Sequence, residues 1–272
     1  MQTQPKLTDR RALTRNRARA DLSKGMFLHE AAIEEVQDRL RMVNRGFTRP
    51  AIVTGFPVVW QRCVPNALIV SDTDVLDLQE REHDLVIHAL GLHWADDPVG
   101  QVIQSRRALK PDGLFLAVTF GGQTLNELRS ALAQAEIEIT GGLSPRVVPM
   151  GEIRDLGALL QRAGLALPVA DSVPTKVTYE TPWNLMRDLR SMGETNALHQ
   201  RLRKPTRRQV LIRAAEIYVN SFMENGRIPA TFDMVFMTGW APDDSQPQPL
   251  RPGSASTRLA DALGASEIKL PK

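Results

Sequence analysis

The sequence predicts an α/β protein built around a mainly parallel sheet. Two short apolar runs, Leu85 to Leu90 and Leu114 to Phe120, are bounded by turn residues and separated by about one helix. Runs of this kind indicate buried parallel strands joined by a helical crossover. Hydrophobic residues make up 42% of the 272 residues, which is enough for a real core. The length fits one large domain or a core domain with additions.

The other elements expected along the chain follow the same α/β pattern. A helix is expected from Asp9 to Asp21, and apolar residues recur at helical spacing between Phe27 and Val43. The remaining predictions are strands at 51–55, 67–70, 85–90 and 114–120, a helix beginning at Pro98, a turn at 110–113, helices at 123–138 and 152–162, and strands at 167–178 and 234–240.

Three parts of the chain follow from this order. Residues 1–48 form an N-terminal helical extension, and residues 49–241 form the α/β domain. That domain includes an Arg-rich helical insertion at about 182–225. The stretch 242–272 is rich in Pro, Ser and Gly, which predicts an extended tail.

Many of the basic residues lie in two clusters. The formal net charge is only +3, from 34 Lys/Arg and 31 Asp/Glu. Residues 1–24 hold seven Lys/Arg against two Asp, and residues 201–213 hold six Lys/Arg and no acid. Each cluster could meet an acidic partner, a membrane surface or nucleic acid, and each is also explained by a solvated helix face. No aromatic residues are interleaved with them, so no specific nucleic acid partner is expected.

Composition also limits the compartment and the chemistry. The single cysteine, Cys63, excludes a disulfide framework, fits a reducing compartment and is expected to be a small buried residue. No apolar run reaches the roughly 18 residues that cross a bilayer, and the amino terminus lacks a secretory apolar region. Because Asp9 and Asp21 also argue against a mitochondrial presequence, we expect a bacterial cytoplasmic protein, peripheral at the inner membrane at most. No metal-ligand spacing is present, so no metal is expected.

Candidate functional residues follow the two apolar runs of the opening. Ligands in parallel sheets bind beyond the carboxyl ends of the strands, and there the chain places His93-Trp94 and Gly121-Gly122. His93 could act as a base or orient a substrate, and Trp94 could stack on an adenine or a guanidinium. A purely structural role for this pair is equally compatible with the sequence. Thr124 is expected to cap the next helix.

Three longer segments carry a resemblance to a known family. They are HALGLHWADDP, LKPDGLFLAVTFGGQTLNELR and GGLSPRVVPMGEIRDLGALLQRAGL, and they resemble class I S-adenosylmethionine-dependent methyltransferases. Within that family they are most similar to the arginine-hydroxylase assembly factors of respiratory complex I and their bacterial relatives. They are more distantly similar to the malonyl-acyl-carrier-protein methyltransferases. The start LTDRRALTRNRARA and the later segments DLRSMGETNAL, MVFMTGWAP and LRPGSA resemble the assembly-factor group as well.

The resemblance implies a Rossmann-like class I methyltransferase fold and S-adenosylmethionine as the cofactor. It also implies methylation, or the related hydroxylation, of an arginine in a protein partner such as a complex I subunit. His93 and Trp94 would then be the catalytic candidates. The cofactor would lie against Thr54, Gly55, Asp72, Ala89 and Leu92, and the acceptor against Gly121, Gly122, Arg146 and Asn196.

One motif departs from the family pattern. The first strand of the family runs into an acidic residue and a glycine-rich turn, where the backbone can approach the cofactor. Here the turn reads Val53-Thr-Gly-Phe-Pro-Val-Val59, so one glycine remains and the acid is absent. Phe56 and Pro57 fill the turn, and proline also removes a backbone donor. The alternative function is therefore a cofactor-free relative that acts as a binding or assembly protein.

The region after this turn is also short. Only 29 residues separate Gly55 from Leu85, whereas two helices and two strands with their turns need roughly 40. The sequence therefore predicts the loss of the second strand and its helix. Asp72 is then either the acid after a second strand that holds the ribose, or the acid after a third strand near the adenine, or a turn cap. The third-strand alignment is favoured because it keeps the spacing to Asp84.

Overall fold

The computed structural model describes residues 6–247 and 264. The chain divides into two compact units, residues 1–242 and 243–272, and every helix and strand of the described residues lies in the first. The predicted tail at 242–272 falls mostly outside the described residues, and so does the LRPGSA segment.

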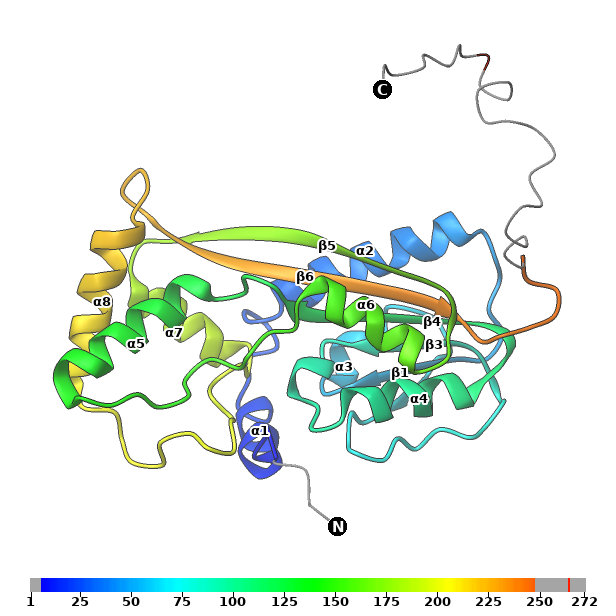
Figure 1. Ribbon diagram of the computed structural model, residues 1–272, viewed down its shortest axis with the longest axis horizontal. Coiled ribbons are helices and arrows are strands. Elements are labelled where there is room, and N and C mark those ends of the chain that lie inside the picture. Colours follow the sequence, from blue (N-terminus) through cyan, green and yellow to red (C-terminus); the bar gives the residue numbers. More distant parts are fainter. Residues whose placement is uncertain (1–5, 248–263, 265–272) are drawn as a thin grey trace, which may run out of the picture. The chain divides into compact units, whose positions relative to one another are not determined.

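A six-stranded sheet in the order β2-β1-β3-β4-β6-β5 is the centre of the first unit (Figure 1). Its first four members in this order pair in parallel, and β6 is antiparallel to both β4 and β5. The strands are β1 (Pro50–Thr54), β2 (Leu68–Val70), β3 (His83–Ala89), β4 (Leu109–Gly121), β5 (Ala166–Tyr179) and β6 (Ile228–Trp240). The predicted α/β, Rossmann-like fold is confirmed.

Helices cover both faces of this sheet. They are α1 (Arg10–Arg17), α2 (Phe27–Val43), α3 (Pro57–Trp60), α4 (Pro98–Ala108), α5 (Asn126–Thr140), α6 (Ile153–Arg162), α7 (Pro182–Ser191), α8 (Arg208–Phe222) and the 3₁₀ helix η1 (Leu92–Trp94). Apolar residues of α2, α5, α7 and α8 share one core with one face of the strands, and those of α4 and α6 share another core with the opposite face.

The strand sequences explain this three-layer arrangement. Successive side chains of a strand point to opposite faces, so Ile52 enters one core while Ala51 and Val53 enter the other. Both faces are covered, which is why β1, β3 and most of β4 are almost continuously buried and mainly apolar. The apolar runs thus report a buried central sheet.

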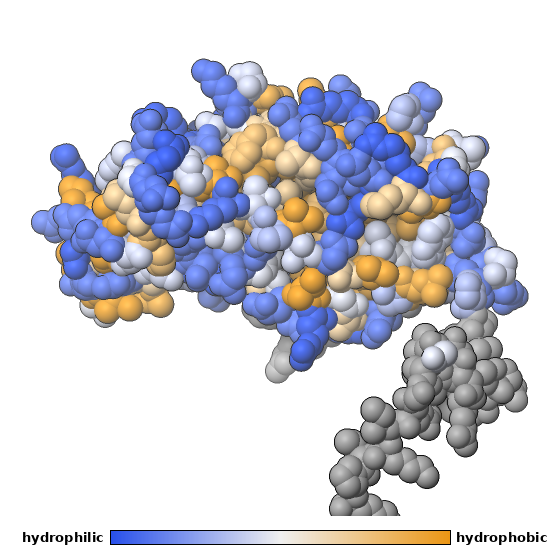
Figure 2. Space-filling model, turned by 90° about the horizontal axis from the view of Figure 1, so that it is seen from above, coloured by the Kyte–Doolittle hydropathy of each residue, from blue (hydrophilic) through white to orange (hydrophobic). Residues whose placement is uncertain are grey.

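The long strands β5 and β6 join the sheet to the α5, α7 and α8 helices. Figure 1 shows them running from the sheet toward these helices, and their pairing continues to Tyr179 and Ile228. β5 is the outer strand of the sheet, and its Leu167 and Val169 are 47% and 56% exposed. Figure 2 shows hydrophobic residues interspersed with hydrophilic ones on one face of the molecule.

The turn expected at 110–113 is present as a bend within the span of β4. The register with β3 passes from Leu109 directly to Leu114, the register with β6 begins at Leu114, and Asp112 adopts a φ of 58°. Two other local predictions need correction. The helix expected to reach Asp21 ends at Arg17. Thr124 does not cap α5, because its hydroxyl donates to the Gly121 carbonyl oxygen instead.

The shortened region contains one strand that pairs directly with β1. β2 is this strand, and it aligns Leu68 with Ala51. In a doubly wound sheet the neighbour of the first strand on this side is the second strand. β2 thus takes the position beside β1, and the correspondence of Asp72 with the acid of a second or of a third strand stays a prediction.

Two histidines are buried in this fold as neutral core residues. His29 accepts a hydrogen bond of 2.9 Å at Nδ1 from the indole of Trp60, and His88 Nε2 lies 2.8 Å from Gln101 Oε1. Burial lowers the pKa of His29 to about 4 and that of His88 to about 4. His88 is thus the core residue that its strand position predicts. Cys63 is also buried, as expected.

We expect the free energy of unfolding to fall as the pH drops from about 6.5 toward 4. In that window the unfolded chain binds protons on these two histidines and the native chain does not, which costs about 1.4 kcal/mol per pH unit for each group. Urea unfolding between pH 4.5 and 7.5 measures this. The His29→Gln variant should lose about half of the dependence, and a flat wild-type profile would contradict the assignment.

Candidate functional site

The chain reverses direction across the sheet between β1 and β3. From β1 it continues to β2 on one side, and then crosses to β3 on the other side. Such a switch point opens a crevice at the carboxyl ends of the two strands. The β1 end carries Thr54 and Gly55, and the β3 end leads into His93 and Trp94 of η1. Most of the predicted site residues therefore lie along one edge of the sheet.

The strand ends bring His93 to β4, as the parallel pairing predicts. His93 Nδ1 lies 3.3 Å from the hydroxyl of Thr119, and its ring centroid lies 5.1 Å from that of Phe120. Gly121 follows directly as the last residue of β4. The His93-Trp94 pair and the paired glycines thus share one rim of the sheet.

The turn after β1 is filled by its own side chains. The Thr54 hydroxyl accepts a hydrogen bond of 3.1 Å from the backbone N–H of Phe56. The Phe56 ring is buried, at 5% exposure, and its centroid lies 4.8 Å from that of His29. α3 begins at once with Pro57. An apolar ring therefore occupies the turn that the glycine-rich family pattern leaves open.

An ion pair crosses the crevice from α1. The Arg17 guanidinium donates to both carboxylate oxygens of Asp72, at 2.8 and 2.9 Å, and the two side chains are 9% and 4% exposed. A Cβ added to Gly55 would collide with this guanidinium, and one added to Gly91 would lie 2.7 Å from Asp72 Oδ2. Burial alone would raise the pKa of Asp72, but the Arg17 charge outweighs burial and holds that pKa below its ordinary value. α1 thus closes over the strand ends.

A second buried acid, Glu194, lies beside η1. Its Oε2 accepts a hydrogen bond of 2.8 Å from the Trp94 indole and lies 3.4 Å from His93 Nε2, while Oε1 has no partner among the described residues. Burial alone would raise the pKa of Glu194. His93, Arg17 and the Trp94 indole outweigh burial, and the pKa lies below its ordinary value. Glu194 is therefore a buried carboxylate with one free oxygen.

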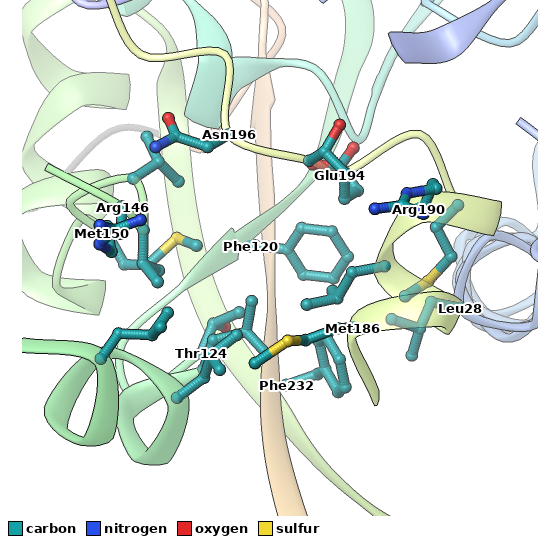
Figure 3. Close-up of a pocket in the computed structure, with 18 of the residues that line it drawn as sticks. Leu28, Phe120, Thr124, Arg146, Met150, Met186, Arg190, Glu194, Asn196 and Phe232 are labelled. Atoms are coloured by element: carbon teal, nitrogen blue, oxygen red, sulfur yellow. The ribbon is translucent and has the colours of Figure 1, made fainter. Parts of the chain in front are cut away.

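A cavity of about 290 Å³ borders this acid (Figure 3). Its size is near the lower end for ligand pockets, and its wall is mainly apolar, as such pockets usually are. The labelled residues in Figure 3 that line it are Leu28, Phe120, Thr124, Arg146, Met150, Met186, Arg190, Glu194, Asn196 and Phe232. Trp94 lines it too, so the cavity joins η1 to the inserted helices.

Two of the residues predicted on the acceptor side, Arg146 and Asn196, line this cavity. Arg146 binds both oxygens of Glu136, at 3.0 and 2.7 Å, which neutralises its charge. Asn196 donates to the carbonyl oxygen of Pro145 at 2.9 Å. The two residues therefore hold the loop around Pro145 against the segment that carries Glu194.

Gly121 and Gly122 are required by the backbone geometry at this edge of the sheet. A Cβ on Gly121 would lie 2.9 Å from the Gly151 carbonyl oxygen, and Gly122 has a φ of 50° that favours glycine. Two other predicted cofactor residues, Ala89 at the end of β3 and Leu92 just after it, are buried in the two cores. Contacts of these four residues with a ligand remain predictions.

Comparison with known proteins identifies the family. The chain is 39% identical over 199 residues to the "Arginine-hydroxylase NDUFAF5, mitochondrial" of Danio rerio, covering 73% of this chain and 62% of that protein. It is 35% identical over 176 residues to the "Malonyl-[acyl-carrier protein] O-methyltransferase" of Laribacter hongkongensis, covering 65% and 57%. The chain belongs to the class I S-adenosylmethionine-dependent methyltransferase family.

Other comparisons are more distant. The solved structure of the phosphoethanolamine N-methyltransferase 2 of Haemonchus contortus is 11% identical with a TM-score of 0.43, covering 77% of this chain and 53% of that one. No family model matches the chain. Because the chain spans about three fifths of the length of the Danio rerio and human hydroxylases, 62% and 60%, their whole activity does not transfer to it directly.

In this member of the methyltransferase family the crevice does not fit the cofactor in the family manner. Both oxygens of Asp72 are bound to Arg17, and the Arg17 guanidinium lies against Gly55. Phe56 fills the turn, and Pro57 has no N–H to donate. A hollow of about 500 Å³ remains between α1 and the ends of β1 and β2, lined by Gly55 and Asp72.

Sequence reasoning missed the two charged groups that dominate the site. Arg17 lies in the N-terminal basic cluster, 55 positions from Asp72. No local sequence pattern predicts that these two residues form an ion pair. Glu194 lies in the MGETN stretch that resembles the family, and its position after a glycine in a turn was the only signal.

Two features are absent from residues 6–247 and 264, the part of the chain that the structure describes. No group of three or more His, Cys, Asp or Glu residues there is arranged to hold a metal ion. None of its helices has both the length and the apolar character that a membrane crossing requires.

The Arg17–Asp72 pair should contribute measurably to stability. Arg17→Met leaves a buried carboxylate without a partner, and we expect the free energy of unfolding at pH 7 to fall by about 3–5 kcal/mol in urea titrations. The matched control is Arg10→Met, which removes the exposed Arg10–Asp74 pair and should cost less than about 1 kcal/mol.

The same pair predicts a pH dependence. The folded pKa of Asp72 is lowered, so its contribution is complete above the unfolded pKa of about 3.9 and is lost as the pH falls through the folded value. The difference between wild type and Arg17→Met should therefore shrink below about pH 4. A difference that stays constant would show that the pair is not the cause.

Proposed function

We propose that this chain is an acceptor-binding member of the methyltransferase family that recognises an arginine-bearing protein, such as a complex I subunit, during respiratory complex I assembly. In this proposal it acts in the bacterial cytoplasm without using S-adenosylmethionine. One observation carries it: in the hollow at the strand ends Arg17 binds both oxygens of Asp72, whereas the cavity at η1 is already formed. The names of the arginine hydroxylases that the chain resembles support an arginine acceptor.

The geometry supports binding of an acceptor more than transfer of a group from a cofactor to it. A transferase needs its two reactants held together in the correct orientation. Here the cofactor side would require Arg17 to leave Asp72, which exposes a buried carboxylate, and Phe56 to leave the turn. The acceptor side requires no such change, because the cavity is already formed.

The second candidate is a cofactor-dependent enzyme that methylates or hydroxylates the same arginine. The hollow lined by Gly55 and Asp72 favours it, because this hollow lies at the switch point where such sheets bind nucleotide ligands. In that case Asp72 would hold the ribose once Arg17 moved away. His93 and Trp94 would then lie between the cofactor and the acceptor cavity.

Calorimetric titration with S-adenosylmethionine separates the two candidates. We expect no saturable binding by the wild-type chain up to millimolar cofactor, an affinity weaker than about −4 kcal/mol. Binding with a micromolar dissociation constant, about −8 kcal/mol, would refute the cofactor-free proposal. Arg17→Met and the Arg10→Met control are titrated in parallel, and binding gained only by the former identifies the ion pair as the block.

A further inference from the structure

Three of the side chains that line the cavity beside η1 are charged: Arg146, Arg190 and Glu194. A charged group in an apolar wall either has a partner within the protein or favours one in a ligand. Arg146 is already paired, because it donates to both oxygens of Glu136. The partners of the other two therefore decide which charge a ligand of this cavity can carry.

The Glu194 carboxylate is compensated within the protein. Burial alone would raise its pKa, but His93, Arg17 and the Trp94 indole outweigh burial and hold that pKa below its ordinary value. One of its oxygens has no hydrogen-bond partner among the described residues, but that oxygen is fully buried, so a group bound in the cavity cannot reach it. Glu194 therefore does not select a cationic ligand.

Arg190 is the remaining charged side chain of the wall. It lies in the last turn of α7 and lines the cavity while remaining exposed, so it stands at the opening to solvent. Figure 3 shows it among the side chains around the cavity. Its guanidinium forms no ion pair or hydrogen bond with any described residue. The described part of the opening therefore carries an unpaired positive charge.

The rest of the wall is mainly apolar, and buried side chains such as Phe120, Leu128 and Phe232 contribute to it. An apolar group gains free energy when such a wall removes it from water. At the opening, an anionic group would meet the Arg190 guanidinium, whereas a cationic group would face a like charge. The arrangement therefore selects an apolar group that has an acidic group beside it.

We propose that the cavity receives an apolar side chain of the acceptor protein, such as a leucine, and that an acidic residue next to it pairs with Arg190. This inference rests on the proposed function, because it assumes that the cavity binds the acceptor. It adds the sequence that is recognised, an apolar residue followed by an acidic one near the acceptor arginine. The acceptor arginine itself lies outside the cavity, because Arg190 would repel its charge.

The test uses the indole N–H of Trp94 as a reporter, because Trp94 lines the cavity. The probe is the peptide acetyl-Leu-Glu-Gly-Arg-amide, titrated into the full chain and followed by NMR. The Trp94 signal is assigned with Trp94→Phe, and the indole of Trp60, which donates to the buried His29, reports that the fold is intact. We expect the Trp94 signal to shift in a saturable manner.

Three changes to the peptide separate its parts. Alanine in place of the leucine removes most of the apolar group and should weaken binding at least about tenfold. Glutamine in place of the glutamate keeps the shape, removes the charge and should weaken binding about threefold to fivefold, as expected for an ion pair at an exposed opening. Citrulline in place of the arginine tests the proposed function instead, because it removes the acceptor charge and leaves the other two groups.

One change to the protein tests the partner of the acid. Arg190→Met keeps the apolar stem and removes the charge, so it should weaken the glutamate peptide about threefold to fivefold and leave the glutamine peptide unchanged. The matched control is Arg187→Met, at another exposed arginine of α7 that does not line the cavity, and it should change neither.

The outcomes separate this inference from the proposed function. Equal binding of the leucine and alanine peptides, or of the glutamate and glutamine peptides, would overturn the inference, and weaker binding of the citrulline peptide would still support an arginine acceptor. Equal binding of the citrulline peptide, with leucine and glutamate still required, would uphold the inference and overturn the arginine acceptor. No shift with any peptide would overturn both. The peptide comparisons need no variant, so they hold even where Arg190→Met fails to fold.

Discussion

A carboxylate and a guanidinium that are both withdrawn from water must pair, because either one left alone in a protein interior is strongly destabilising. Asp72 and Arg17 meet this requirement across the strand ends. Their pairing fixes α1 over the crevice and leaves no space for a side chain at Gly55 or Gly91. The ion pair therefore explains both why the N-terminal helix is part of the compact unit and why the carboxylate at the strand ends is already bound.

Glu194 differs from Asp72 in this respect, because only one of its two carboxylate oxygens is hydrogen-bonded. Asp72 has both oxygens bound by the chain itself, whereas Glu194 has one oxygen bound by Trp94 and one left free. Asp72 is therefore already bound at the strand ends, and Glu194 borders the second cavity. Transfer requires two reactants held side by side, so the occupied Asp72 limits transfer while the cavity still permits recognition.

The parts of this arrangement that the sequence could predict are those set by local periodicity. The apolar runs specify parallel neighbouring strands, so the proximity of His93 to β4 follows from the sequence alone. Residue spacing alone could not predict which strand β2 would pair with, because the sequence of a short strand does not specify its partner. It also could not show that Arg17 meets Asp72, since the pair depends on how α1 docks. The turn signal at 110–113 marks a real bend, but it could not show that strand structure continues on both sides of it.

The docking of α1 links the two sides of the site. Ahead of the helix, the backbone N–H groups of Leu7 and Thr8 donate to Asp96 beyond η1, and Asp9 pairs with Arg201 of the inserted region. At its other end, a Cβ on Gly193 would lie 3.1 Å from the Cα of Arg17. The residue before Glu194 thus packs against the helix that carries Arg17. The segment that carries Glu194 and the helix α1 that carries Arg17 therefore pack against each other. Part of the basic N-terminal cluster thus forms internal contacts within the compact unit.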